Sequence, residues 1–494
     1  MRLCWEKQSR DANQSAAAQP NWTTPAPSAP KQHQQHHQHN PHHHHPKSHP
    51  PHTLIPILIP LSIMTTPIRI AISGGGLAGA CLLHALLPHK HLDVHIFESA
   101  SSFKESGMAV GIARNALSAL DLIGPSTAQC LSRAGAVPMR GVRFMLAQGP
   151  DAESLISETH ENDDITDNEK RVTSIVHRAA FLHELLSGVD PERMHASKKL
   201  ERYVENPDGS LVLYFADGTI HECDILIGAD GIRSTVRRLI LGEEDPAAKP
   251  RSTGAWCVMT LMPYTEVQKC LGKGFVDVED AREYMWVGDG SYLIHNVLQQ
   301  GELVQVVVAT HEKEGEVKAD RWNRMVGVEE IRGLFKGWPQ RLYEAVDQLL
   351  CTKDEQPAMY LWEHPPASTY VSGPVCIMGD AAHATSPWQG SGGGMSVEDS
   401  MILSTLLGRA ETVTQARTAL QVYDRVRRPR TQRIVESSRG TGRIACGLGE
   451  ETGLDLGKLR GKLLPRWDFI VDFDNEKHRD EAVEMFEREV KGET

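Results

Sequence analysis

The chain has 494 residues, of which 40% are hydrophobic and 23% are charged, and its formal net charge is −12. These values are typical of a globular protein long enough for two packed domains, and the negative charge argues against a nucleic-acid partner. The nine cysteines form no C-x-x-C pair, so we expect reduced thiols in a cytoplasmic protein. No zinc-binding pattern such as H-E-x-x-H occurs, and the sequence predicts no metal site.

Residues 1–64 differ in composition from the rest of the chain and are rich in histidine and proline, as in the run His42–His45. Such a segment buries too little apolar surface to offset its ordering entropy, so we expect a disordered leader. Incidental low complexity is favoured over weak metal binding by the histidines. The apolar run Leu54–Met64 is short and contains two prolines, so we expect no stable membrane insertion.

A Gly-rich turn follows the first recognisable strand. Ile68–Ser73 is an apolar run of the kind that forms a buried parallel strand, and Ala80–Leu87 reads as an apolar helix. The residues between these elements fit G-x-G-x-x-G. Gly74 permits the tight turn, Gly76 lets the backbone approach a pyrophosphate, and Gly79 lets the helix and the strand pack closely.

A second predicted strand, Leu92–Phe97, is followed by Glu98. An acidic side chain at this place accepts a hydrogen bond from a ribose hydroxyl and repels a 2′-phosphate, which favours FAD or NAD over NADP. Glycine clusters also form ordinary turns, but here strand, glycines, helix, second strand and acid occur in order. The sequence therefore predicts a dinucleotide site, and these residues leave open which dinucleotide it binds.

Two later segments also combine a buried strand with an acid and a glycine. The segment Cys223–Arg238 holds an apolar strand that ends in D-G and is followed by a short basic helix. The segment Val375–His383 holds another buried strand, which ends in G-D. A Gly-rich turn, Pro387–Gly394, then leads into a predicted helix over Met395–Leu407.

Together these motifs resemble those of the class A aromatic hydroxylases, the salicylate hydroxylase-like FAD-dependent monooxygenases. Members of that family carry G-x-G-x-x-G, D-G and G-D in this order and at about these separations. The resemblance extends from Pro67 to about residue 440. It implies an α/β fold in which a Rossmann-like FAD-binding domain is interleaved with a β-sheet substrate domain.

The resemblance also implies a domain organisation. Residues 65–250 and 355–445 would form the discontinuous FAD-binding domain, residues 251–354 the substrate sheet, and residues 446–494 a C-terminal helical tail. Within this tail, Arg466–Phe473 and the charged helix to Thr494 are expected to pack on the outside. The basic face of the helix around Tyr423–Arg428 would cover the FAD-binding domain, although a solvated charged face is the favoured alternative. Four strands are expected in the substrate sheet: Ala255–Leu261, Glu283–Val287, Ser291–Leu298 and Leu303–Ala309.

Cofactor contacts follow from the resemblance residue by residue. Asp380 would form a hydrogen bond with the ribityl chain of FAD, and the backbone at Gly392, Gly393 and Gly394 would approach the flavin. The positive end of the helix after these glycines would then face the N1–C2=O edge of the flavin. The alternative for Asp380 is a helix cap or another structural role.

Three further positions match less specific family patterns. Asp230 lies in a segment that serves both FAD and NAD(P)H, or else it caps the helix that begins near Ser234. Arg178, in an H-R pair, would approach the flavin and the cofactor phosphates, unless it is an ordinary surface arginine. Gly111 would contact the flavin through its backbone, unless it is an ordinary turn glycine.

The implied activity is that of a hydroxylase. The chain has no second strand–GxGxxG–helix unit for a nicotinamide domain, so NADPH or NADH would dock transiently. NAD(P)H would reduce FAD, O₂ would add to form a flavin C4a-hydroperoxide, and one oxygen atom would pass to a small aromatic or polyketide-like substrate. His295 is the candidate for phenol activation because imidazole titrates near neutral pH, although a structural histidine is the favoured alternative.

Three positions depart from the family pattern. Trp256 is followed by Cys257 where relatives often have an arginine, Asn296-Val297 replaces Tyr-Pro, and Arg114 replaces the proline of Pro-Asn-Ala. These changes leave FAD binding intact, but they put the substrate and the catalytic arginine in doubt. The alternatives are a flavin oxidase or an isoprenoid-lipid reductase on the same fold, and an inactive FAD-binding regulator.

Overall fold

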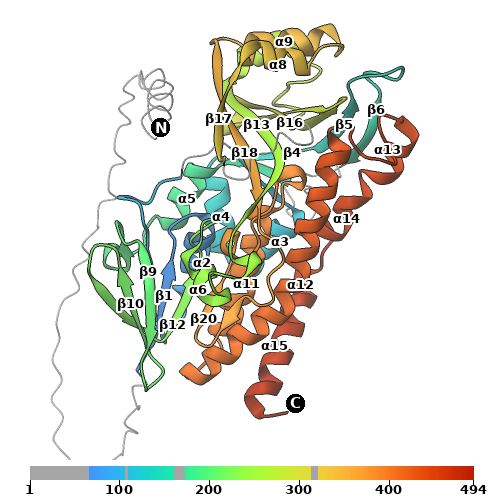
Figure 1. The fold of residues 1–494 in the computed structure, drawn as a ribbon. Coiled ribbons are helices and arrows are strands. Elements are labelled where there is room, and N and C mark those ends of the chain that lie inside the picture. The colour runs from blue at the N-terminus through green and yellow to red at the C-terminus, as the bar shows by residue number, and fades with distance from the viewer. Residues whose placement is uncertain (1–65, 106–108, 161–172, 313–320, 494) are drawn as a thin grey trace, which may run out of the picture. The chain divides into compact units, whose positions relative to one another are not determined.

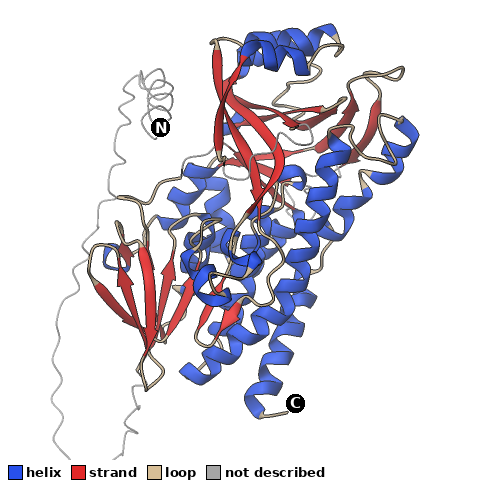
Figure 2. Ribbon diagram, viewed as in Figure 1, coloured by secondary structure: helices blue, strands red, loops and turns tan. Residues whose placement is uncertain are grey.

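The computed structural model describes residues 66–105, 109–160, 173–312 and 321–493. These residues belong to a unit that spans Met64–Thr494. The expected disordered leader over residues 1–64 lies outside the described residues. Helices and strands are mixed along the whole described chain, as expected for the α/β class (Figure 1 and Figure 2).

The first sheet carries the Gly-rich turn, and its strands lie in the order β19-β20-β12-β1-β2-β8. β1 pairs in parallel with both β2 and β12, and β12 pairs in parallel with β20. The carboxyl ends of strands that are distant in sequence therefore meet at one edge of the sheet. The bounds are β1 (Ile68–Ser73), β2 (Leu92–Phe97), β8 (Met194–His195), β12 (Ile225–Gly228), β19 (Val371–Ser372) and β20 (Val375–Ile377).

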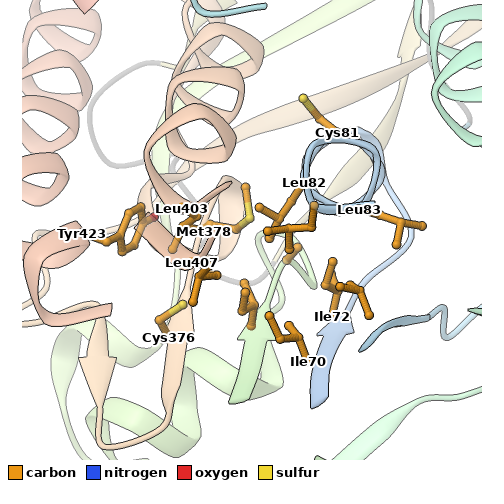
Figure 3. Packing of buried hydrophobic residues seen from close by; sticks show 14 of the residues in the cluster. Ile70, Ile72, Cys81, Leu82, Leu83, Cys376, Met378, Leu403, Leu407 and Tyr423 are labelled. Carbon is orange, nitrogen blue, oxygen red and sulfur yellow. The ribbon is translucent and has the colours of Figure 1, made fainter. Parts of the chain in front are cut away.

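Two helices cover this edge of the core, α2 (Leu77–Leu86) and α11 (Gly392–Leu407). Ile72 of β1, Leu82 of α2 and Leu403 of α11 are fully buried in one cluster (Figure 3). Almost every residue of α11 is buried, so this helix runs through the interior and needs no polar face. The burial of apolar side chains thus fixes α2 and α11 beside the strand ends.

The second sheet is larger, with the strand order β17-β18-β13-β16-β15-β14-β5-β6. The four strands predicted from the sequence are confirmed and lie at the centre of this sheet. They are β13 (Arg251–Pro263), β14 (Arg282–Val287), β15 (Ser291–Leu298) and β16 (Leu303–His311). The expected limits of this sheet at residues 251 and 354 are too narrow. Outside these limits it includes β5 (Gly141–Leu146), β6 (Leu155–His160) and β18 (Glu355–Glu363), and inside them a further strand, β17 (Asn323–Gly327).

The two faces of the large sheet pack against different parts of the molecule. Along β14, Tyr284 and Trp286 join a cluster with helices α7 (Tyr264–Leu271), α8 (Val328–Leu334) and α9 (Gln340–Leu350). The alternate residues Met285 and Val287 point to the opposite face, where they join a cluster with Trp388 and Cys446. This second face looks toward the part of the chain that carries the Gly-rich turns.

Helix α12 (Val413–Ala445) and the helices that follow it complete the core. The helices of residues 446–494 bury one side each, and this side takes part in the core. Leu459 and Ile470 are buried, and Phe486 joins the same cluster as the first sheet. These residues lie on α13 (Leu456–Lys462), α14 (Pro465–Val471) and α15 (Asn475–Lys491).

The remaining elements connect these layers. Two three-stranded sheets have the orders β11-β10-β9 and β3-β7-β4. Their strands are β3 (Ala109–Ala113), β4 (Val137–Met139), β7 (Thr173–His177), β9 (Leu200–Glu205), β10 (Leu211–Phe215) and β11 (Ile220–Cys223). The helices not yet named are α3 (Arg114–Ile123), α4 (Pro125–Arg133), α5 (Arg178–Leu186), α6 (Thr235–Leu241) and α10 (Asp380–His383). Among the described helices, none is long and apolar enough to cross a membrane.

Candidate active site

The Gly-rich turn after β1 can be built only with glycine at two of its positions. Gly74 has φ +113°, and a Cβ there would lie 2.2 Å from the carbonyl oxygen of Ala229. A Cβ at Gly79 would lie 2.0 Å from the carbonyl oxygen of Gly74. The turn is therefore packed tightly against its own helix and against the end of β12.

Glu98, at the end of β2, holds this turn in place. The N–H of Gly75 donates to Glu98 Oε2 at 2.8 Å, and the N–H of Ala100 donates to Oε1 at 2.6 Å. The acid that was predicted to contact a ribose thus lies beside the Gly-rich turn. Its oxygens keep further lone pairs for a hydroxyl donor.

The N-terminus of α2 is open. Its N-cap, Gly76, offers no side-chain cap, and the first turn contains no acidic residue. A Cβ at Gly76 would meet one described atom, Oε1 of Glu105, at 3.1 Å. Arg178 pairs with Glu105 at 3.1 Å, and the Nε of Arg178 is buried without a partner among the described residues. The structure thus brings Arg178 next to the Gly-rich turn, where its charge suits an anionic ligand.

The G-D turn after β20 meets the start of α2. Gly379 has φ +57°, and a Cβ there would lie 2.8 Å from Cβ of Ala78 and 3.1 Å from Oγ of Ser396 on α11. The next residue, Asp380, is exposed, and its Oδ1 lies 4.0 Å from the place of a Cβ at Gly392. The carboxylate of Asp380 therefore faces the beginning of α11.

Helix α11 begins at Gly392, one turn earlier than predicted, and so includes the three glycines. Its N-cap, Ser391, provides no side-chain cap, and the first turn has no acidic residue. A Cβ at Gly393 would lie 2.8 Å from Cγ2 of Val110, and one at Gly394 would lie 3.3 Å from Cβ of Ala116. These glycines let α3 and β3 lie against the open end of the helix.

Gly111 lies on β3 next to Val110. A Cβ at Gly111 would make ordinary contacts, 3.6 Å from Cδ1 of Ile175 and 3.7 Å from Oγ1 of Thr173. The protein itself therefore does not require glycine here. A role for this backbone in flavin contact stays a prediction.

Asp230 has a different environment from Asp380. Its Oδ2 accepts hydrogen bonds from the N–H groups of Thr235 at 2.7 Å and Val236 at 3.1 Å, at the N-terminus of α6. Burial raises the pKa of Asp230, which those hydrogen bonds and that of Ser234 oppose. The carboxylate of Asp230 therefore caps α6, which is the alternative role expected for it. Its contact with a cofactor stays a prediction.

Sequence reasoning missed a buried network of charges below the open end of α11. Asp399 Oδ2 accepts from the N–H of Gly379 at 3.0 Å and lies 2.6 Å from Nε2 of His383. Asp399 Oδ1 accepts from Arg427 Nε at 2.9 Å, and Glu398 pairs with Arg430 at 2.8 Å. The expected solvated face of α12 is therefore wrong at Arg427 and Arg430, which are buried. Two adjacent acids just after the glycines were the available signal.

His295 lies on the face of the large sheet that packs against α7 and α9. It is buried, its Nε2 accepts from Trp286 Nε1 at 3.3 Å, and its ring stacks on Tyr284. Burial lowers the pKa of His295 to about 3. Its neighbours in the strand, Ile294 and Asn296, point to the opposite face. This position disfavours the predicted role of His295 in activating a phenol and agrees with the structural alternative.

A row of polar side chains crosses the face that looks toward the glycine turns. Gln305 Nε2 donates to Asn296 Oδ1 at 3.3 Å, and the N–H of Ala109, at the start of β3, donates to Gln305 Oε1 at 3.0 Å. Glu283 on β14 continues the row, two residues before Met285 on the same face. The alternation of side chains along the predicted strands indicates that these polar residues share one face of the sheet. It does not indicate which of the two faces lies toward the cofactor.

The geometry fits a dinucleotide that carries a pyrophosphate and a second electron-rich group. The N-termini of α2 and α11 are both uncapped by side chains, and Gly379 lies between them. By contrast, the N-terminus of α6 is capped by Asp230 and Ser234. Open N–H groups attract anionic oxygens, and the nearby glycines leave no Cβ in the way. The site is thus suited to FAD.

Several known proteins are similar to this chain. Residues 347–438, which include the G-D turn and the glycines of α11, match the family model described as FAD binding domain. The chain is 36% identical over 431 residues to 6-methylsalicylate 1-monooxygenase of Aspergillus terreus, a match that covers 85% of this chain and 92% of that protein. It is 31% identical over 426 residues to salicylate hydroxylase of Pseudomonas putida, which covers 82% and 92%.

A solved structure of a salicylate hydroxylase substrate complex superposes with a TM-score of 0.72 at 26% identity, covering 84% of this chain and 98% of that one. Each of the two relatives named above matches more than four fifths of this chain. The chain binds FAD and belongs to the salicylate hydroxylase-like family of FAD-dependent aromatic monooxygenases.

Proposed function

We propose that this monooxygenase takes electrons from NADH or NADPH and uses O₂ to hydroxylate a small phenolic or polyketide-like substrate. The observation that carries the proposal is the meeting of two open helix N-termini, of α2 and α11, at Gly379. The exposed carboxylate of Asp380 lies beside them without a partner among the described residues. Bound there, FAD would supply the two-electron chemistry that activates O₂.

Each end of the cofactor would have its own residues. The N–H groups after Gly76 and the guanidinium of Arg178 would bind the pyrophosphate, and Glu98 would accept from the ribose. Asp380 would accept from the ribityl hydroxyls, while the N–H groups at Gly392–Gly394 would face the flavin ring. The contacts proposed for Gly111 and Asp230 rest on the family pattern alone.

The substrate would lie between the flavin and the large sheet. Met285, Ile294 and Trp388 belong to one apolar cluster on that face. Such a wall excludes water and leaves room for stacking on an aromatic ring. A small aromatic substrate is supported by the names of two relatives, which act on 6-methylsalicylate and salicylate.

The test is to load the full chain with FAD and follow NADH and NADPH oxidation under ¹⁸O₂ with a panel of phenols. We expect oxidation that one class of phenol stimulates, together with a product heavier by one ¹⁸O atom. A product that forms without either nicotinamide would instead identify an oxidase. Bound FAD that neither nicotinamide reduces, with every phenol present, would identify a catalytically inactive flavoprotein.

A further inference from the structure

The face of the large sheet that looks toward the glycine turns is only partly buried at its middle, where Met259, Ile294 and Val307 keep accessible surface. On this face the ring of Trp388 lies against Tyr292, with 5.7 Å between the ring centroids. A second apolar cluster nearby includes Leu261 and Ile175.

Two polar side chains on this face keep unused hydrogen-bonding capacity. Asn296 is 1% exposed, and its Nδ2 has no hydrogen-bond partner among the described residues. Glu283, next to it in the row, is partly accessible and makes no hydrogen bond or ion pair with any described residue. Leaving a buried donor without an acceptor is unfavourable, so such a group marks the place of a missing partner.

Arg443 is a charged group near His311. Five other ionisable groups on or beside this face have pKa values that burial shifts toward their neutral forms. They are Cys257, Tyr292, His177, His311 and Cys446, and burial raises the pKa of the two thiols and of Tyr292 and lowers the pKa of both histidines. Burial alone also raises the pKa of Glu283, to about 7, so no charged neighbour among the described residues compensates its carboxylate. Within this set, Glu283 is the group that changes charge near neutral pH.

The residue that stands in place of the family arginine also bears on which substrates this face can bind. Cys257 lies on this face of β13 and is buried, with no positive charge to offer a substrate carboxylate. A ring carboxylate would instead lie near the carboxylate of Glu283, and two like charges in a desolvated site repel each other. A phenolic hydroxyl has no such conflict, because it can donate to Glu283.

We propose that Glu283 accepts the phenolic proton of the substrate and that Asn296 donates a hydrogen bond to a neighbouring oxygen, so that the site prefers phenols without a ring carboxylate. This inference rests on the hydroxylase function proposed above. In the step, the phenolic O–H bond breaks, the proton moves to the Glu283 carboxylate, and the electron pair stays on the phenolate oxygen. The ring becomes more electron-rich, which prepares it to receive an oxygen atom.

Binding tests the preference without any turnover. FAD-loaded full-length protein is titrated calorimetrically at pH 8 with 3-methylphenol and with 6-methylsalicylate, which differ by one carboxylate. We expect the wild type to bind 3-methylphenol about tenfold more tightly or better, a gap of about 1.4 kcal/mol. Glu283→Gln should lose this preference, and Glu302→Gln, the same change at an exposed position after β15, should keep it. Tighter binding of 6-methylsalicylate by the wild type would overturn the proposal.

The pH profile tests the proton transfer. The turnover rate of the wild type with 3-methylphenol should rise with pH through about 7, where Glu283 loses its proton. Glu283→Gln should lower kcat by about 10²–10⁴-fold and remove this rise, as expected for the loss of a general base. A fluorinated phenol that is already ionised at pH 7 should restore most of the rate, and Glu283→Asp should restore part of it.

The outcomes separate the two proposals. If Glu283→Gln keeps its FAD and matches Glu302→Gln in rate, pH profile and ligand preference, Glu283 is a structural residue and the hydroxylase function stands. If the wild type oxidises no nicotinamide with any phenol, the hydroxylase function fails. The calorimetric preference then still decides the role of Glu283 in binding.

Discussion

At the scale of single residues, glycines in one turn serve two different purposes. A Cβ at Gly79 would strike the backbone of Gly74, whereas a Cβ at Gly76 would approach the flexible end of Glu105 and the space for the ligand. The first glycine is therefore needed by the protein fold, and the second by the bound cofactor. Glycines of one motif are therefore predicted to give different phenotypes when replaced: loss of stability at one position and loss of FAD binding at the other.

Replacing each glycine by alanine separates these roles. Gly79→Ala should destabilise the FAD-free protein by about 1–3 kcal/mol, because the new methyl group overlaps a backbone oxygen. Gly76→Ala should leave the melting temperature of the FAD-free protein unchanged and weaken FAD binding about tenfold or more, as expected for one lost charge-assisted hydrogen bond. Thermal melts and flavin fluorescence titrations of both variants measure the two effects, and equal effects of both changes on Tm would contradict this division.

Asp380 offers a second prediction, because its exposed carboxylate supports no described part of the fold. Asp380→Asn should weaken FAD binding about tenfold, since one carboxylate acceptor is lost, with little change in the urea midpoint of the FAD-free protein. Asp399→Asn is the matched comparison. Asp399 accepts from Gly379 and Arg427 in the interior, so that variant should lower the urea midpoint itself.

The sequence predicted the glycines and acids of the motifs well, because a tight turn or a close backbone approach restricts the residue type. It could not place His295, because alternation along β15 shows that neighbouring side chains face opposite ways without showing which face meets the flavin. Asn296 and Glu283 were missed for the same reason. Only the packing of α7 and α9 against one face decides the question.

At the scale of elements, α11 and α12 are joined through charges. Arg427 and Arg430 of α12 hold Glu398 and Asp399 of α11, and the N–H of Gly379 donates to Asp399. Pairing buried charges this way fixes the position of the open helix end relative to the G-D turn. The basic residues of α12 resembled a solvated surface in sequence, because their partners lie about 30 residues earlier and pair with them only in the folded chain.

This network predicts sensitivity to acid. Burial alone would raise the pKa of Glu398, but Arg427 and Arg430 outweigh it and lower the pKa to about 2; Asp399 is lowered as well, through His383 and Arg427. Because the folded pKa values lie below the ordinary ones, this stability is present above about pH 5 and is lost as pH falls toward 2. Urea midpoints measured from pH 7 to pH 3 should therefore decline.

Glu398→Gln provides the control for this prediction. The variant should be less stable at pH 7 by about 3–5 kcal/mol, the cost of leaving buried arginines without a charged partner, and its decline with acid should be shallower. A wild-type midpoint that stays constant between pH 5 and pH 3 would show that these carboxylates do not control acid stability.

At the scale of the whole molecule, the two large sheets are built from interleaved parts of the chain. β5 and β6 come from residues expected in the FAD-binding domain, yet they pair in the large sheet. The sequence predicted the strands themselves from alternation and composition. It could not predict this exchange, because strand pairing across a long separation depends on the folded arrangement.

The C-terminal helix gives a prediction at this scale. Deleting residues 474–494 removes Phe486 from the core and the hydrogen bond from Asn475 Nδ2 to the carbonyl of Asn115 at 2.6 Å. Since Asn115 also donates to Glu398 at 2.6 Å, the truncated protein should melt at lower temperature and retain less FAD after gel filtration. Deleting residues 1–63 is the control, and it should leave the FAD content unchanged because every candidate site residue follows Met64. An unchanged melting temperature in the first truncation would refute the argument.

The strand order of the first sheet also has a consequence for biosynthesis. β1 pairs with β12, Ile70 opposite Ile225, and β12 pairs with β20, Ile227 opposite Cys376. A growing chain that has passed β12 therefore presents an unpaired strand edge until most of the protein has left the ribosome. The cofactor cannot be captured during that interval, because Asp380 and the glycines of α11 have not yet been made. Supply of FAD thus acts on chains whose synthesis has passed α11, and until then the edge of β12 stays open to wrong strand pairing.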